Sequence, residues 1–137
     1  MSFYSDQAKQ FEQMAGEIET RLTNEGSTLD DTTYANLEQQ RDTLQDKADV
    51  MITADVQAAL GQLKIDQTAL AKCTADLVHA VKAVKRFDQI AAIVSAAVTL
   101  ATALASADLG GIASGIAGAE KAVAAAVKPQ PAPDAKS

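Results

Sequence analysis

Large rings and reactive side chains are scarce in this chain. It contains no tryptophan, one histidine and one cysteine, and only 4% of its 137 residues are aromatic. A lone cysteine excludes an intrachain disulfide, which fits a reducing compartment or a fold that does not depend on oxidation. With few rings available, the core must be built from Ala, Val, Leu and Ile. Alanine has the best helix propensity and lets helices approach closely, so the composition predicts an all-α fold.

Motifs that signal catalysis or metal binding are missing as well. The sequence has no phosphate-binding loop, no dinucleotide fingerprint, no nucleophile beside a general base and no paired His or Cys ligands. His79 lies away from the apolar side of its predicted helix and is expected to face solvent. Cys73 lies on the apolar side and is expected to be buried as a small hydrophobe. We therefore expect no enzyme, no cofactor, no metal site and no small-molecule substrate.

Acidic residues dominate the first half of the chain. Residues 1–70 carry thirteen Asp and Glu against five Lys and Arg, a net charge of −8, whereas the remainder carries +2. One acidic row at helical spacing is interpreted as a solvated face; it comprises Glu38, Asp42, Asp46 and Asp49. Nucleic-acid binding needs a basic surface, and the densest basic group is only Lys82, Lys85 and Arg86. We expect no nucleic-acid partner.

The N-terminal sequence lacks an export signal. The chain begins with MSFYSDQAKQ. A secretory signal peptide needs a basic region followed by an apolar run, and neither is present in these ten residues. We expect cytoplasmic synthesis without a signal peptide, and leaderless export or membrane association remains open.

Helical periodicity begins near the N-terminus. Residues 4–24 are predicted to form a helix because apolar side chains recur on one stripe. The stripe comprises Tyr4, Phe11, Met14, Ile18 and Leu22. Gly26 is expected to close this helix in the left-handed conformation, and Ser27 or Thr28 to cap the next one, with an acid three residues on. The two helices should then be antiparallel neighbours.

A seven-residue spacing of apolar side chains runs through the middle of the chain. It starts with Leu37, Leu44 and Met51 and continues with Val56, Leu63, Leu70, Leu77, Val84, Ala91, Val98 and Ala105. A continuous helix over this span would exceed about 100 Å at 1.5 Å per residue. We therefore favour a break at residues 52–55, where Thr53 can cap a new helix, with Gly61 as a weaker second break. A continuous rod would instead need partners along its length.

The longest apolar segment lies near the C-terminus. Residues 90–107 are eighteen residues without a charge, and a second apolar arm extends to Val127 after a turn at residues 108–111. About 20 helical residues cross the roughly 30 Å of a bilayer's hydrocarbon, so the first arm has the lower limit of spanning length. The pattern predicts a helical hairpin.

Small side chains recur at helical spacing on both arms of this hairpin. One face of the first arm carries four hydroxyls, those of Ser95, Thr99, Thr102 and Ser106. The second arm carries Gly111, Gly115 and Gly118, a spacing that lets two helix backbones approach. In a membrane these residues would pack helices or line a narrow wet lumen. In water the hydroxyl face would simply be the exposed side of a buried helix.

Basic residues gather at the open end of the hairpin if its arms fold back on each other. Lys82, Lys85 and Arg86 precede the first arm, and Lys121 lies in the second. This distribution favours a hairpin that enters an anionic bilayer from one side, with the first three residues as headgroup anchors. Asp108 at the tip opposes entry at a cost on the order of 2.5 to 3.5 kcal/mol on insertion scales. Insertion is therefore expected to be conditional and assisted by oligomerisation.

The sequence thus predicts an all-α protein in three parts. Residues 1–88 are expected to form a long antiparallel bundle of acidic, coiled-coil-like amphipathic helices. Residues 89–127 are expected to form an Ala-rich apolar helical hairpin, and residues 128–137 a disordered Pro-rich tail.

Three classes of function fit this pattern. The first is a non-enzymatic membrane-active protein, a soluble bundle that oligomerises and inserts its hairpin to form a pore or remodel lipid. Such an architecture resembles α-helical pore-forming toxins of the cytolysin A type, although no motif is shared. The second is a soluble helical adaptor, secretion chaperone or immunity-type protein that binds a partner protein, and the third is a structural assembler that polymerises through the long seam. We favour the first, with membrane lipid and a homo-oligomer or helical partner protein as the expected partners.

Overall fold

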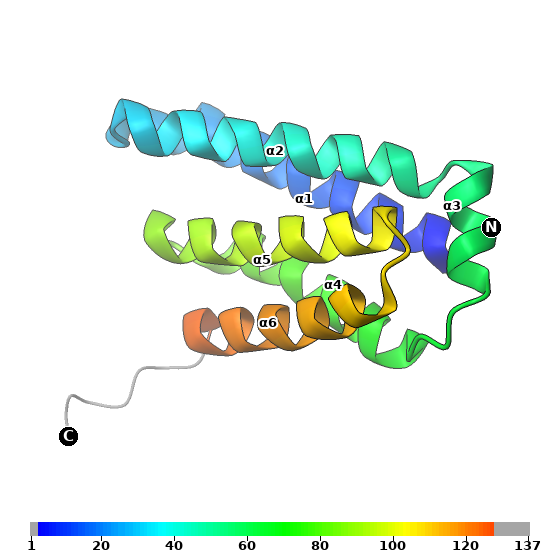
Figure 1. Cartoon of the computed structure of the whole chain (residues 1–137). Helices are drawn as coiled ribbons and strands as arrows, with labels where there is room; N and C mark the ends of the chain where they lie inside the picture. The colour runs from blue at the N-terminus through cyan, green and yellow to red at the C-terminus, as the bar shows by residue number, and fades with distance from the viewer. Residues whose placement is uncertain (1–2, 128–137) are drawn as a thin grey trace, which may run out of the picture.

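The computed structural model describes residues 3–127, which form helices packed around one core (Figure 1). In chain order these are α1 (Phe3–Glu25), the short 3-10 turn η1 (Gly26–Thr28), α2 (Asp31–Met51), α3 (Ala54–Gly61), α4 (Gln67–Ala83), α5 (Phe87–Ala105) and α6 (Leu109–Val127). Residues 3–127 contain no strand, so the all-α prediction is confirmed. The predicted Pro-rich tail, residues 128–137, lies outside the described residues.

Helix α1 is amphipathic, and its apolar stripe enters the core. All of its predicted stripe residues are buried, namely Tyr4, Phe11, Met14, Ile18 and Leu22. The helix packs on α2 and on α4, so it joins these two helices to each other. A buried hydrogen bond from Thr74 of α4 to the side-chain oxygen of Gln7 adds a polar contact between α1 and α4.

The turn between α1 and α2 differs from its prediction. No glycine in the described chain has a positive φ, so Gly26 does not close α1 in the left-handed conformation. Its small size is needed for packing instead, because a Cβ at this position would lie 2.5 Å from Cε2 of Tyr34. Asp30 caps α2, rather than either hydroxyl residue before it, by accepting a hydrogen bond from the N–H of Thr33 at 2.7 Å. This bond also lowers the pKa of Asp30.

The seven-residue seam is divided among several helices. Helix α2 ends at Met51, and α3 begins at Ala54 with Thr53 at its N-cap, so the predicted break is confirmed. Helix α3 ends at Gly61, the second predicted break. Further turns precede α4 and α5. The chain therefore folds back on itself instead of forming one long rod.

Helix α5 lies at the centre of the fold. It contacts α2, α4 and α6, and Figure 1 shows it between α2 and α6. Eight of its residues are buried, namely Ile90, Ile93, Val94, Ala97, Leu100, Ala101, Ala103 and Leu104. Full burial of a Val, Leu or Ile side chain contributes about 1.5 to 3 kcal/mol. Helix α5 therefore supplies a large share of the hydrophobic stabilisation.

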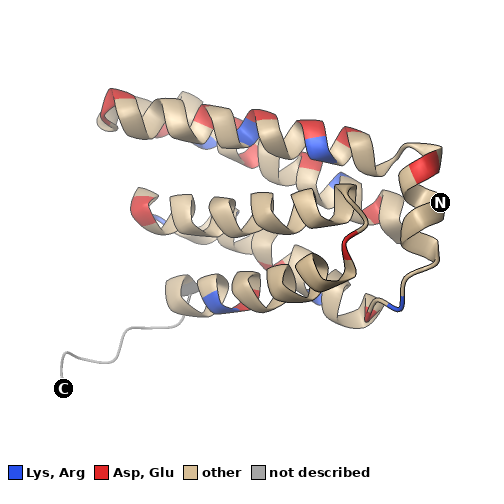
Figure 2. Cartoon of the chain, in the orientation of Figure 1, with Lys and Arg blue, Asp and Glu red and all other residues tan. Residues whose placement is uncertain are grey.

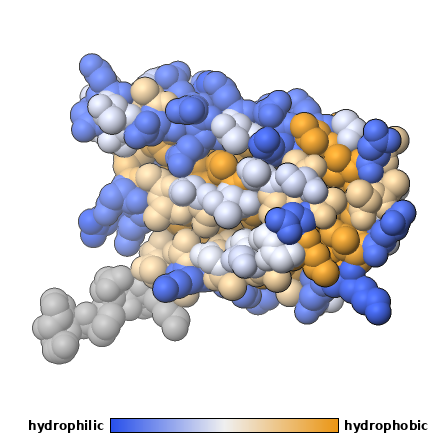
Figure 3. Space-filling view, viewed as in Figure 1, coloured by the Kyte–Doolittle hydropathy of each residue, from blue (hydrophilic) through white to orange (hydrophobic). Residues whose placement is uncertain are grey.

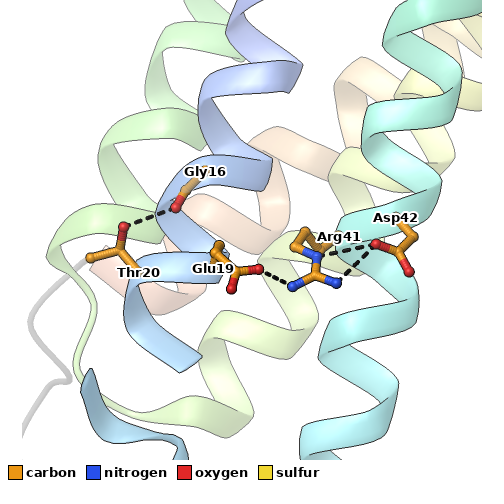
Figure 4. A network of polar contacts seen from close by, with 5 residues as sticks. All are labelled: Gly16, Glu19, Thr20, Arg41 and Asp42. Carbon is orange, nitrogen blue, oxygen red and sulfur yellow. Dashed lines mark hydrogen bonds and ion pairs between the residues drawn. The ribbon is translucent and has the colours of Figure 1, made fainter. Parts of the chain in front are cut away.

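Charged residues are spread along α1 and α2 (Figure 2). Arg41 of α2 pairs with Glu19 of α1 and with its neighbour Asp42, as Figure 4 shows. Exposed pairs of this kind contribute about 0 to 1 kcal/mol each. The predicted acidic row follows this solvated side of α2, with three exposed members and Glu38 half-buried.

Candidate functional site

The predicted hairpin is present as α5 and α6, which pack on each other along their length. Its turn is shorter than expected, because α6 already begins at Leu109. Asp108 caps α6, and its carboxylate accepts a hydrogen bond from the N–H of Gly111 at 3.2 Å. The acid at the tip therefore has a structural role that the apolar pattern of the sequence did not indicate.

A left-handed residue closes α5. Ala107 has a φ of 51°, and it is the one non-glycine residue with a positive φ in the described chain. Its N–H donates to the carbonyl of Leu104, and the N–H of Asp108 donates to the carbonyl of Ala103, each at 3.0 Å. These two bonds form the Schellman arrangement, in which glycine usually occupies the left-handed position.

The hydroxyl face of α5 points mainly outward. Ser95, Thr99 and Ser106 are exposed, and Thr102 is half-buried. The hydroxyl of Thr99 donates to the Ser95 carbonyl one turn earlier, at 3.0 Å. The large apolar side chains of α5 point the other way, into the core. In this structure the face is thus the solvent side of a buried helix.

The glycines of α6 differ in their surroundings. A Cβ on Gly115 would lie 3.1 Å from the Cα of Leu100, so the backbones of α5 and α6 are in close contact there. A Cβ on Gly111 would lie 2.8 Å from the Asp108 carboxylate. Gly118 has nothing within 4 Å of such an atom. The first two glycines serve packing inside the hairpin, and Gly118 leaves open space beside it.

This open space is a shallow groove of about 280 Å³ between the two arms. Small side chains line it, among them Ala92, Ser95, Thr99, Ser114, Gly118 and Ala122. Figure 3 shows the same face, with hydrophilic side chains gathered over α2 and weakly polar or apolar ones over α5 and α6. Neither α5 after Asp88 nor α6 before Glu120 contains a charged residue. The hairpin thus presents a neutral surface of small side chains.

The predicted headgroup anchors lie at the junction of α4 and α5. Lys82, Lys85 and Arg86 are all exposed. Arg86 forms an ion pair with Asp88 (Nη2–Oδ2 2.8 Å), which partly neutralises it. The α4–α5 junction and the C-terminus of α6 lie at the same end of the molecule, opposite the hairpin tip (Figure 1).

Arg21 of α1 reaches this junction, and the sequence analysis did not identify it. Its guanidinium donates to the carbonyls of Val81 and Lys82, and it lies over the ring of Phe87, with 5.6 Å from Cζ to the ring centroid. The two hydrogen-bonded partners are 60 and 61 residues away in the chain. Helical periodicity and capping motifs concern residues only a few positions apart, so they cannot predict a contact over that separation.

Cys73 is buried where α4 meets α6, as predicted. It is 1% exposed, and its Sγ lies 4.0 Å from the carbonyl oxygen of Ile116. Burial raises the pKa of the Cys73 thiol to about 12, and the carboxylates of Glu120 and Asp76 add to this effect. The buried thiol of Cys73 is therefore expected to be unreactive in this structure.

By length and composition, α5 is the one helix in the described chain that could cross a membrane, and 44% of its apolar window is buried. Helix α6 does not meet this measure. The two arms of the hairpin are therefore similar in length but differ in their capacity to span a membrane.

His79 is exposed, as predicted, and residues 3–127 contain no group of three or more His, Cys, Asp or Glu able to hold a metal ion. No family model matches the chain, and comparisons with curated proteins and with solved structures give no match.

Proposed function

We propose that this chain is a non-enzymatic membrane-active protein, stored as a soluble bundle, whose α5–α6 hairpin moves into lipid. The carrying observation is α5 itself, which contains no charge between Asp88 and Asp108 and has the length of a membrane span. Exposed lysines at the open end suit anionic headgroups. At the tip, Leu109 is 43% exposed and is placed to enter lipid first.

The order of the helices supports such a movement. The hairpin is joined to the preceding helices through one connection, residues 84–86, which we call the hinge. The contacts of α1 with α2 and with α4 do not involve the hairpin. Helices α1, α2 and α4 can therefore stay together while α5 and α6 leave.

The energetics require that lipid take part in the opening. Exposing the large apolar side chains of α5 to water would cost about 1.5 to 3 kcal/mol each. Five of its eight buried residues are Val, Leu or Ile, so the total cost is about 8 to 15 kcal/mol, similar to the roughly 5 to 15 kcal/mol that stabilises a typical domain. Opening is therefore favourable only when hydrocarbon, or another copy of the hairpin within it, accepts the same side chains.

The outer face of α6 supports a second candidate, a soluble adaptor that binds a helical partner protein. Ala113, Ala117, Ala124 and Gly110 are exposed there, and Leu109 at the start of α6 is the one large apolar side chain exposed on this helix among the described residues. Lipid-binding helices are anchored by several such side chains. Small side chains allow close packing with another helix. This candidate predicts complex formation that is indifferent to lipid.

Leakage of dye-loaded vesicles tests the membrane proposal, and Thr99→Arg is the decisive variant. Thr99 is exposed in the closed structure, so an arginine there leaves the core intact while placing a charge in the middle of the span. That charge costs on the order of 2.5 to 3.5 kcal/mol or more in a bilayer. We expect Thr99→Arg to abolish leakage from anionic vesicles. Leu100→Arg is unsuitable because Leu100 is fully buried and its loss would disrupt the fold.

Thr20→Arg is the matched control. Thr20 is also exposed, and its hydroxyl donates to the Gly16 carbonyl just as Thr99 bonds to Ser95 (Figure 4). It lies on α1, outside the hairpin, so leakage should persist. Equal leakage from the Thr99→Arg and Thr20→Arg proteins would exclude α5 as the inserting element. Failure of the wild-type protein to bind anionic or neutral vesicles would favour the adaptor.

A further inference from the structure

The side chain of Arg21 connects three helices at the hinge. Its Nη1 donates to the carbonyl oxygens of Lys82 (3.2 Å) and Val81 (3.4 Å) in the last turn of α4. Its Cζ lies 5.6 Å from the ring centroid of Phe87, the first residue of α5. Glu25, one turn later in α1, forms an ion pair with its Nε at 2.9 Å. We call this set the hinge contact.

The hinge contact uses carbonyl groups at the C-terminal end of α4. The last four carbonyls of a helix have no intrahelical donor and form the negative end of its dipole, so a cation is favourable there. The side chain of Arg21 is only 12% exposed, which makes its charge-assisted hydrogen bonds stronger than those of a surface pair. An aromatic ring beneath the guanidinium adds a further attraction.

We propose that Arg21 is a conformational lock that holds the α5–α6 hairpin closed. A hairpin that leaves must rotate about residues 84–86 while α4 stays on α1 through its buried contact with Gln7. That rotation removes Phe87 from the guanidinium, whereas the hydrogen bonds from Arg21 to the end of α4 stay and hold the guanidinium in place. What the opened hairpin does rests on the proposed membrane function, whereas the lock concerns only the opening.

Cys73 provides a native reporter of the opening. It is the only cysteine in the chain, and it is buried against α6. A small maleimide can reach its thiol only after α6 leaves α4 or the whole protein unfolds. The rate of labelling in lipid-free buffer therefore measures the open population without any membrane.

The test compares Arg21→Gln with wild type in the full chain. Loss of the cation–π contact between Arg21 and Phe87, which is the part of the hinge contact that opening breaks, is expected to raise the labelling rate of Cys73 about fivefold. Arg41→Gln is the matched control, because Arg41 joins α1 to α2 through Glu19 and does not touch the hinge. It should leave the rate within about twofold of wild type.

A second labelling site separates local opening from global unfolding. Ala15 is 4% exposed beside the α1–α2 contact, so Ala15→Cys combined with Cys73→Ala reports on that interface. With Arg21→Gln added, this site should keep its slow labelling. An unchanged rate at Cys73, or an equal rise at both sites, would overturn the lock. Because lipid is absent, either result is independent of whether the protein permeabilises vesicles.

Discussion

At the scale of single residues, close packing between α5 and α6 depends on one glycine. A Cβ on Gly115 would press on the Leu100 backbone at 3.1 Å, and backbone atoms give way poorly. We expect Gly115→Ala to lower the free energy of unfolding by about 1 to 3 kcal/mol, as overpacked sites do. Urea unfolding followed by circular dichroism measures the change.

Gly118→Ala is the control for this prediction. It lies on the same helix with nothing within 4 Å of a new Cβ, so only helix propensity changes. Its free energy of unfolding should rise by about 0.5 to 1 kcal/mol. If the free energy of unfolding changed in the same direction and by a similar amount in both variants, the close approach of the two helices would not be the reason for a glycine at position 115.

Residues on a single helix were predictable, and contacts between distant helices were not. The buried stripe of α1, buried Cys73 and exposed His79 follow from helical period alone, because period determines which side faces the core. Arg21 and the packing of Tyr34 against Gly26 depend on how helices are placed in space. A periodic pattern carries no such information.

At the scale of elements, the end of α5 is held in a costly conformation. Ala107 occupies the left-handed position of the Schellman arrangement, where an L-residue with a side chain loses about 1 to 2 kcal/mol. We expect Ala107→Gly to raise the midpoint of thermal unfolding, through a gain of about 1 kcal/mol.

Ala113→Gly, in the same hairpin, is the control, and it is expected to lower the midpoint of thermal unfolding. Ala113 is exposed inside α6, where glycine costs about 1 kcal/mol relative to alanine. A fall in the unfolding midpoint for Ala107→Gly as well would contradict the interpretation that its backbone is strained.

Helix ends were predictable where side chains supply the stop signal. The end of α3 at Gly61 follows from propensity. Thr53 stands at the N-cap of α3 as predicted, although its hydroxyl donates to the Val50 carbonyl of α2 at 2.8 Å and not to α3. The α5–α6 turn was placed too late, because the sequence glycines looked like a turn although they lie within α6. Gly111, one of these glycines, lies against the Asp108 cap, where a Cβ would be 2.8 Å from the carboxylate.

At the scale of the whole molecule, Asp108 links the stored and proposed inserted forms. As a cap it stabilises α6 in water, and as a charge at the tip it opposes entry into lipid. Asp108→Asn keeps the cap and removes the charge. If about half of the insertion cost of an Asp is removed, vesicle leakage should become roughly tenfold faster.

The same variant should leave soluble stability nearly unchanged, which urea unfolding can verify. Faster leakage together with a large loss of stability would mean that the variant acts by loosening the fold. Unchanged leakage with unchanged stability would indicate that Asp108 does not cross hydrocarbon.

The fold class was predictable as a whole, whereas the arrangement was not. Composition and periodicity predicted an all-α protein with an apolar C-terminal hairpin. They left open whether the more apolar arm is buried in water, and they did not indicate that α2, α4 and α6 would be the helices that cover it. That position depends on which helices share a core, which only the three-dimensional structure shows.

The central place of α5 also sets an order for biogenesis. A ribosome makes α1, α2 and α4 first, at about 5 to 20 residues per second. Until α5 emerges, the apolar side chains of α2 and α4 that pack against it are exposed to solvent. This exposure lasts for seconds at that rate of translation. Helices α5 and α6 are translated after the helices that they pack against, so the core is expected to close only once they have emerged, and a holding chaperone is favoured in the interval.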